Sequence, residues 1–506
     1  MHLGSLDFLQ NHITGYGFTS ASKKKGIREE VEEFTSRQKF DIVIMNPPFS
    51  RSAKPNVRYG YKEKDVQQLM KEKEKELLQL YDLRGAGKAG IGALFIVLGD
   101  VLLKNEGRMG VVIPRAFLSG VSWSKIRRML LDNYEILYII SNFDPGDKGR
   151  RVEPWNWSED TDLGEIMFVA QKTTKPFSDR YVTYVNFHKK PASDVESLFA
   201  TFDILKKKPT LQHTLDQGVW EEIRLGDQIV GTLYKVKQDD LKHLPNFQTP
   251  CLFANPELNR FILNLHKDKN LQDLLVPLPN ITANQGVDIA QVKNHFAESS
   301  LPTNYKIVRG QQKDMNTMLI NKIGYGRAKT PRADRVYKRY KGDVLLSERP
   351  HLNNDALICF ESSYPVLATA MWELRLQSNV PKELFVLWMN STIGLLLYLS
   401  CATNSMGEIF KFKKEHMNGL KVLSPSILSP EEVSAGIDLY KKIRNQPFAP
   451  FPEEFSQAIE GKGLRKQIDD FFIRVLGDRN VKMDLSDVYE MLATEPIFTL
   501  KRLPFG

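Results

Sequence analysis

Residues 40–50 read FDIVIMNPPFS, an apolar run of strand-forming residues that stops at Asn46, Pro47, Pro48 and Phe49. Two consecutive prolines cannot continue a strand, and a proline restricts the backbone of the residue before it. A continuous apolar run predicts a strand that is covered on both faces. The sequence therefore predicts a core strand over 40–46 whose end presents an amide, two rigid imide units and an aromatic ring.

The residue types at this strand end suit one kind of chemistry. In an open parallel sheet, ligands bind beyond the carboxyl ends of the strands. The Asn46 side-chain oxygen and the Pro47 carbonyl are two acceptors, which match the two protons of an exocyclic amino group. Accepting those protons keeps the nitrogen lone pair from delocalising into a ring and makes the nitrogen more nucleophilic. Phe49 adds a flat surface for a heteroaromatic ring, so the pattern indicates methyl transfer to a base or amide nitrogen.

The flanking sequence alternates helical and strand patterns. Helices are expected over 62–81, 90–107 and 123–134, and strands over 108–114, 135–141 and 165–172. This alternation predicts a mostly parallel α/β sheet. No helix separates the strands expected at 135–141 and 165–172, so the second should run antiparallel to the first. Further along, a strand is expected over 181–187, helices over 193–207 and 381–402, and short strands over 305–310, 342–349 and 356–369.

Composition places few limits on function. The chain has 506 residues, 42% of them hydrophobic, and no apolar stretch of the ~20 residues that a membrane span needs. Three cysteines, far apart, predict a reduced, cytoplasmic protein without a disulfide framework, and no motif predicts a metal site. The net charge of +9 favours a polyanionic partner.

The excess positive charge is concentrated in residues 322–341, which contain eight cations and a single acid, Asp334. The cations are Lys322, Arg327, Lys329, Arg332, Arg335, Lys338, Arg339 and Lys341, with Tyr325, Tyr337 and Tyr340 between them. One interpretation is a solvated basic loop. The other is a nucleic-acid contact, in which cations neutralise phosphates and aromatic rings pack on sugar or base.

The motif Asn46-Pro47-Pro48-Phe49 after an apolar strand resembles the catalytic motif of the N6-adenine DNA methyltransferases. Segments 92–120 and 386–425 resemble parts of type I modification subunits and type IIG enzymes. The resemblance implies that Asn46 and Pro47 bind the amino group of a flipped adenine, that Phe49 stacks on it, and that S-adenosylmethionine donates the methyl group. Double-stranded DNA is the implied substrate, and a restriction-modification or related defence system is the implied context.

The resemblance also implies the architecture. Residues 1–180 would form a partial class I S-adenosylmethionine-dependent, Rossmann-like methyltransferase sheet, and 181–250 a connecting α/β extension. Residues 251–425 would form a mixed α/β target recognition domain, followed by a helical region over 426–506. The basic segment 322–341 falls inside this recognition domain, which favours the DNA-contact interpretation.

One family feature is missing. The family's glycine-rich cofactor turn and acidic strand end should precede FDIVIMN, and residues 1–39 contain no such turn. Segment 1–9 resembles the family's third strand and following loop, where Ser5, Leu6 or Asp7 would contact the cofactor. The strand over 40–46 would then have an open edge. We therefore expect a truncated or split chain, completed by a second polypeptide that carries the missing strands.

Other candidates are weaker. The family packs a second aromatic ring on the flipped base, and Phe143, Trp155 and Trp157 lie in the corresponding loop, where ordinary packing is the alternative. Arg51, Lys54 and Arg58 follow the motif and either hold phosphates of the extruded nucleotide or belong to a solvated loop. Two other functions stay open: a non-catalytic DNA-recognition subunit, and a methyltransferase for RNA or for protein glutamine.

Overall fold

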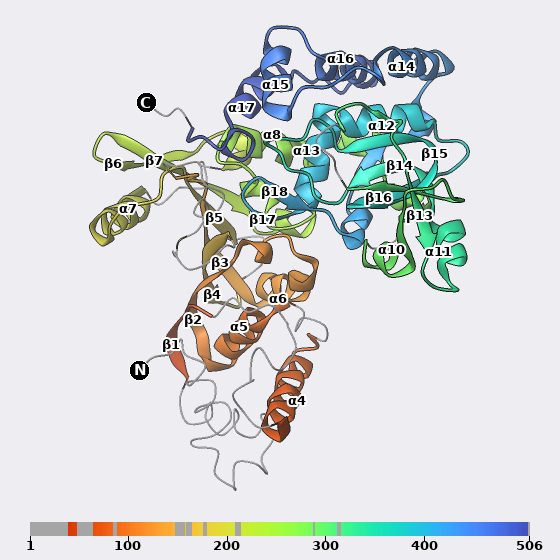
Figure 1. Cartoon of the computed structure of the whole chain (residues 1–506). Helices are drawn as coiled ribbons and strands as arrows, with labels where there is room; N and C mark the ends of the chain where they lie inside the picture. The colour runs from red at the N-terminus through yellow and green to blue at the C-terminus, as the bar shows by residue number, and fades with distance from the viewer. Residues whose placement is uncertain are drawn as a thin grey trace. The chain divides into compact units, whose positions relative to one another are not determined.

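The computed structural model describes residues 39–47, 64–83, 89–146, 157, 164–175, 180–207, 214–286, 289–310 and 315–503 (Figure 1). The chain divides into two compact units. Unit 1 comprises Met1–Asp144 and Arg150–Cys251, and unit 2 comprises Pro145–Gly149 and Leu252–Phe505. Both units combine helices with sheets, so the predicted α/β class is confirmed.

Within its described residues, unit 1 is built on a seven-stranded sheet in the order β1-β2-β4-β3-β5-β7-β6. The strands are β1 Phe40–Met45, β2 Leu103–Pro114, β3 Tyr134–Asn142, β4 Glu165–Lys172, β5 Tyr181–Phe187, β6 Glu221–Leu225 and β7 Gln228–Lys237. β4 lies between β2 and β3 and is antiparallel to both, which confirms the orientation predicted from the missing helix. β1, β2 and β3 run in the same direction, as predicted for this region, although among hydrogen-bonded neighbours only β1·β2 and β3·β5 are parallel. β4 and β7 run antiparallel to the strands on either side of them.

Helices α5 Ile91–Leu102 and α6 Ser124–Asn133 cover one face of this sheet, and α4 Lys64–Leu80 packs on α5 (Figure 1). Nearly all of α5 is buried. A Cβ atom on Gly99 would lie 2.8 Å from Met109 Cε and 2.9 Å from Met45 Cε, so the absence of a side chain lets α5 approach β1 and β2. The helix expected over 90–107 ends earlier than predicted, because residues 103–107 join β2 and Leu103 pairs with Phe40.

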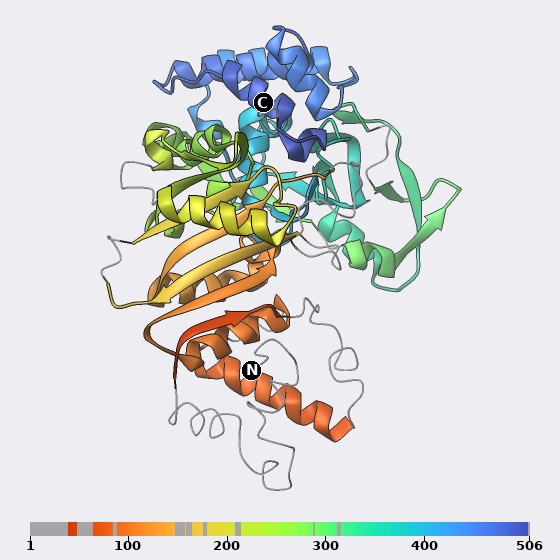
Figure 2. The same cartoon turned by 90° about the vertical axis from the view of Figure 1, so that its left-hand side faces the viewer.

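The strand β1 is covered on one face only. Val43 and Met45 are buried, whereas Ile42 and Ile44 are 60% and 69% exposed. Figure 2 shows β1, in red, at the edge of the unit 1 sheet, where it pairs with β2 and with no other described strand. The prediction of cover on both faces is therefore wrong for the described residues, because no described element packs on the Ile42 and Ile44 side.

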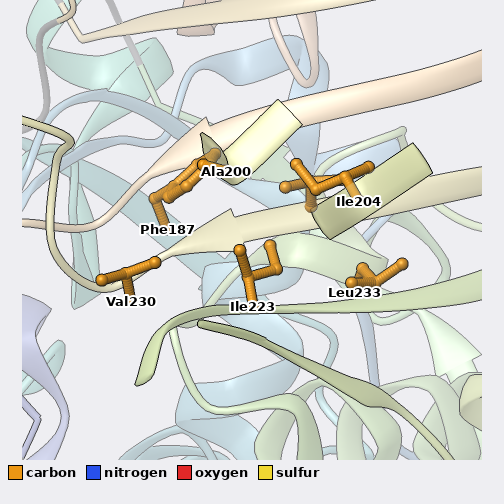
Figure 3. Close-up of a cluster of buried hydrophobic side chains, with 7 residues drawn as sticks. Phe187, Ala200, Ile204, Ile223, Val230 and Leu233 are labelled. Carbon is orange, nitrogen blue, oxygen red and sulfur yellow. The ribbon is translucent and has the colours of Figure 1, made fainter. Parts of the chain in front are cut away.

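A second core of unit 1 lies between β5, β6, β7 and helix α7 Asp194–Lys207 (Figure 3). Its buried side chains are Val185, Phe187, Ala200, Ile204, Ile223, Val230 and Leu233. The opposite side of α7 carries exposed apolar side chains at helical spacing, namely Val195, Leu198, Phe199, Phe202 and Leu205. One helix thus presents both a buried apolar face and an exposed one.

Unit 2 is built on an eight-stranded sheet of described residues in the order β10-β13-β11-β15-β14-β16-β9, with β12 paired to β15. The strands are β9 Thr282–Gln285, β10 Phe296–Ser299, β11 Tyr305–Arg309, β12 Leu319–Ile320, β13 Gly324–Ala328, β14 Gly342–Ser347, β15 Cys359–Thr369 and β16 Met371–Leu376. Two short ladders join β8 Leu275–Pro277 to β19 Lys421–Leu423 and β17 Thr403–Met406 to β18 Ile409–Lys411. The helices are α8 Pro256–Lys267, α9 Lys269–Leu274, α10 Ile289–His295, α11 Ala333–Tyr340, α12 Lys382–Asn390, α13 Thr392–Cys401, α14 Pro430–Ile443, α15 Phe451–Ile459, α16 Leu464–Gly477, α17 Ser486–Thr494 and α18 Pro496–Thr499.

The single helix expected over 381–402 is two helices, α12 and α13, bent by 75° around Ser391. The Ser391 hydroxyl caps α13 by accepting from the Gly394 N–H at 3.0 Å. Asp469 of α16 accepts from the Thr392 N–H at 2.7 Å and from its hydroxyl at 2.6 Å. Together α12 and α13 have the length and apolar composition of a membrane span, but among the described helices no single one does.

Replacing Ile204 with alanine should lower the free energy of unfolding by about 2 kcal/mol or more, because it opens a cavity in the α7 core. Phe202 on the same helix is 52% exposed, and Phe202→Ala should change stability by no more than about 0.5 kcal/mol. Urea unfolding of both variants tests this. Equal losses would show that α7 does not bury the side that the structure gives it.

Candidate functional site

The carboxyl ends of β1, β2 and β3 lie along one edge of the unit 1 sheet, since these strands point the same way. Asn46 follows β1, Arg115 follows β2, and Phe143 follows β3. The antiparallel β4 begins at the same edge, where Glu165 pairs with Pro114. This is the edge at which open α/β sheets bind their ligands.

Asn46 is exposed, whereas Pro47 behind it is buried. Within the described residues the Asn46 side chain makes no hydrogen bond, so no described group competes with a ligand for this amide. Met45, directly before it, is anchored under α5. The amide is therefore carried on a fixed strand end and is available to a ligand.

Phe143 lies at the same sheet edge but is fully buried. Its N–H donates to the Phe187 carbonyl at 2.8 Å, and the Arg115 guanidinium covers its ring at 4.5 Å. Arg115 is held in turn, since its Nη2 donates to the Cys251 carbonyl at 3.0 Å. A base could therefore reach the Phe143 ring only if Arg115 moved.

Trp157 is part-buried and packs against the α7 core, edge-on to Phe187 with ring centroids 5.6 Å apart. Its backbone N–H donates to Glu165 Oε2 at 2.8 Å, and its backbone carbonyl accepts from Lys190 Nζ at 2.8 Å. These contacts account for Trp157 as a packing residue.

Several predicted residues lie outside the described residues, so their placement is not part of this site. They are Ser5, Leu6, Asp7, Pro48, Phe49, Arg51, Lys54, Arg58 and Trp155.

Unit 2 contains a basic groove with a volume of about 1000 Å³. Its lining includes eight cations, Lys293, Arg332, Arg335, Arg339, Arg349, Lys411, Lys413 and Lys414, against two acids, Glu348 and Glu415. His295 and Trp372 also line it. Such an excess of cations in a concave surface concentrates polyanions.

Helix α11 supplies one wall of the basic groove. Its Ala333 and Tyr337 pack into a core with α10, β10, β11 and β15, which leaves Arg332, Arg335 and Arg339 on the groove side. The Tyr337 hydroxyl accepts from the Lys306 N–H and donates to the Pro365 carbonyl, each at 3.2 Å, and burial raises the pKa of Tyr337. Tyr337 is therefore a core residue, so the DNA-contact interpretation of segment 322–341 does not extend to its ring.

The structure separates the predicted cations of segment 322–341. Lys338 of α11 does not line the basic groove. Its hydrogen bond to Asp334 at 2.8 Å raises the pKa of Lys338. Lys329 donates to the Lys293 carbonyl at 3.0 Å and lines a different hollow. The others, Lys322, Arg327 and Lys341, do not line the basic groove.

The second wall, Lys411, Lys413 and Lys414, was not predicted from the sequence. Phe412 fixes this segment, because its ring is buried and stacks on Tyr398 with centroids 4.6 Å apart. Its carbonyl accepts from Trp372 Nε1 at 2.8 Å. The run KFKK at residues 411–414 could have indicated a basic surface. The neighbouring sequence does not show that this run lies in the same groove as α11.

Comparisons with known proteins agree with the resemblance seen in the sequence. Residues 6–146 match the family described as Eco57I restriction-modification methylase. The type II methyltransferase M.BstVI of Geobacillus stearothermophilus is 27% identical over 141 residues, covering 26% of this chain and 22% of that protein. The type II methyltransferase M.BanIII of Aneurinibacillus aneurinilyticus is 23% identical over 246 residues, covering 48% of this chain and 36% of that protein. The predicted resemblance to restriction-modification methyltransferases is thus confirmed, for a chain that spans well under half the length of these relatives.

Among solved structures, the type IIG restriction endonuclease BpuSI aligns with 92% of this chain and 54% of its own, at a TM-score of 0.35 and 13% identity.

The basic groove predicts how two cations of α11 differ. Arg335→Ala should elute from immobilised heparin at clearly lower salt, because it removes a groove cation. Lys338→Ala removes the same charge from the same helix outside the groove and should elute close to the unmodified protein. Equal shifts would mean that net charge, and not the groove, governs polyanion binding.

Proposed function

We propose that this chain carries the catalytic strand end and the DNA-binding part of a site-specific DNA adenine-N6 methyltransferase in a restriction-modification system. The observation that supports this most is the exposed Asn46 amide, which forms no hydrogen bond with any described residue and lies at the end of a strand anchored by Met45. It lies within residues 6–146, the part that matches the restriction-modification methylase family. An exposed loop asparagine would need neither the anchored strand nor the double proline.

In the proposed mechanism, the Asn46 side-chain oxygen and the Pro47 carbonyl accept the two N–H groups of adenine N6. This directs the nitrogen lone pair out of the ring plane, toward the methyl group that S-adenosylmethionine supplies as an electrophile. When bound, S-adenosylmethionine would supply an electrophilic methyl group and leave as its thioether, and N6 would release a proton to water. A clamp made only of acceptors, with no side-chain base, fits a donor that already carries an activated methyl group.

We also propose that a second polypeptide pairs with β1. Its free edge and the exposed Ile42 and Ile44 leave hydrogen-bonding groups and apolar surface uncovered in the described residues. An exposed apolar edge strand is a template for pairing with another chain. A strand added there would lie directly beside Asn46, where residues that hold the cofactor are required.

The basic groove of unit 2 supports a second candidate function, that of a DNA-recognition subunit without activity of its own. The groove does not depend on Asn46, so DNA binding and methyl transfer can be tested separately. DNA binding without methyl transfer under every pairing of chains would favour this candidate.

Asn46→Ala should reduce methyl transfer to DNA by at least 100-fold, because the amino group loses one of its two acceptors. Duplex binding and the melting temperature should stay unchanged, since Asn46 is exposed. Tritiated methyl transfer, measured with and without the product of the neighbouring reading frame, tests this. Asn105→Ala, at an exposed position of β2, is the matched control and should remain active. Full activity of Asn46→Ala would refute the assignment.

Ile44→Lys should abolish co-purification with the proposed partner and the activity that depends on it. The variant should still fold, because Ile44 is largely exposed. Val219→Lys, also at an exposed apolar position of unit 1, should bind the partner normally. Retention of partner binding by Ile44→Lys would show that β1 is not the interface.

A further inference from the structure

Glu348 is an unusual member of the basic groove. It directly follows β14, and its side chain is only 12% exposed. Arg349 Nε lies 3.7 Å from its carboxylate, which is an ion-pair distance but too long for a hydrogen bond. In the part of the chain that the structure describes, no group donates a hydrogen bond to this carboxylate.

The backbone of Glu348 is fixed on both sides. Its N–H donates to the Ala370 carbonyl at 3.0 Å, and its carbonyl accepts from the Phe412 N–H at 2.8 Å. Phe412 lies in the chain between Lys411 and Lys413, which line the groove, so Glu348 sits beside that wall. The point from which the Glu348 side chain enters the groove is therefore fixed.

An acid inside a groove for polyanions opposes binding of phosphates. Within the described residues its polar contact is the long ion pair with Arg349, so a donor of a ligand meets no internal hydrogen bond to displace. A ligand offsets this repulsion when it brings a neutral N–H donor to the carboxylate while its phosphates contact the surrounding cations. The exocyclic amino groups of bases in the major groove are such donors, and acidic side chains accept from them.

We propose that Glu348 is a sequence-reading residue of the basic groove and accepts a hydrogen bond from the exocyclic amino group of a cytosine or adenine in duplex DNA. This rests on the proposed DNA binding by unit 2. Arg335 and Lys413, on opposite walls, neutralise the backbone without reading sequence. Glu415, exposed in the same groove, is not a reader.

The test selects binding sites from a randomised duplex library with the full chain, or with its complex if the partner is required. Glu348→Gln should lower the preference at one cytosine or adenine position by about tenfold. Glu415→Gln removes the same charge from the same groove and should leave the base preference unchanged. Lys413→Ala should weaken binding to all sequences alike and reduce the salt dependence of binding.

Each result supports or overturns a distinct claim. If Glu348→Gln binds DNA with an unchanged base preference, or if both glutamine variants shift it equally, the reading role is refuted while DNA binding stands. If Lys413→Ala and Arg335→Ala bind DNA as tightly as the unmodified protein, the groove is not the DNA site and both proposals fall. Equal melting temperatures of the two glutamine variants exclude misfolding as the cause.

Discussion

Close contact between α5 and the two strands beneath it determines where the catalytic candidate sits. Because position 99 has no side chain, the ends of Met45 and Met109 can both reach α5. Met45 anchored in this way places the following Asn46 at the rim of the sheet. Any larger residue at 99 would push the helix away or displace both methionines, and the amide would move with them. The proposed chemistry thus depends on the packing of two methionine side chains against a glycine, none of which does chemistry.

Local patterns predicted the elements of unit 1 well where a strand is delimited by its own sequence. The ranges 165–172 and 181–187 coincide with β4 and β5, because each is a short run of strand-forming residues between turns. Prediction failed where a distant segment decides the boundary. Leu103 would suit a helix, but it pairs with Phe40 and so begins β2. Likewise, an apolar run cannot reveal that the Ile42 and Ile44 face lacks cover. Hydrophobic side chains favour burial, but the sequence does not show which element buries them.

The sequence predicted more of the Asn46 site than of the basic groove. Asn46 was found because four consecutive residues carry the signal, and their position after a strand follows from the pattern. The basic groove combines Arg332, Arg335 and Arg339 with lysines more than seventy residues later, so no local pattern could join its walls. The number of cations in segment 322–341 also overstated how many of its side chains would reach a ligand. Helix geometry places Lys338 beside Asp334 and Tyr337 in the core.

The bend at Ser391 ties distant parts of unit 2 together. Asp469 of α16 binds the first turn of α13, and the buried Arg465 donates to the Ala356 carbonyl at 2.9 Å next to β15. These two residues lie one helical turn apart, so α16 alone holds both the start of α13 and the segment that leads into β15. A chain shortened before Leu464 would leave polar groups at both places buried without partners. The carboxyl-terminal helices are therefore not a removable appendage, and the smallest fragment that keeps the basic groove must include them.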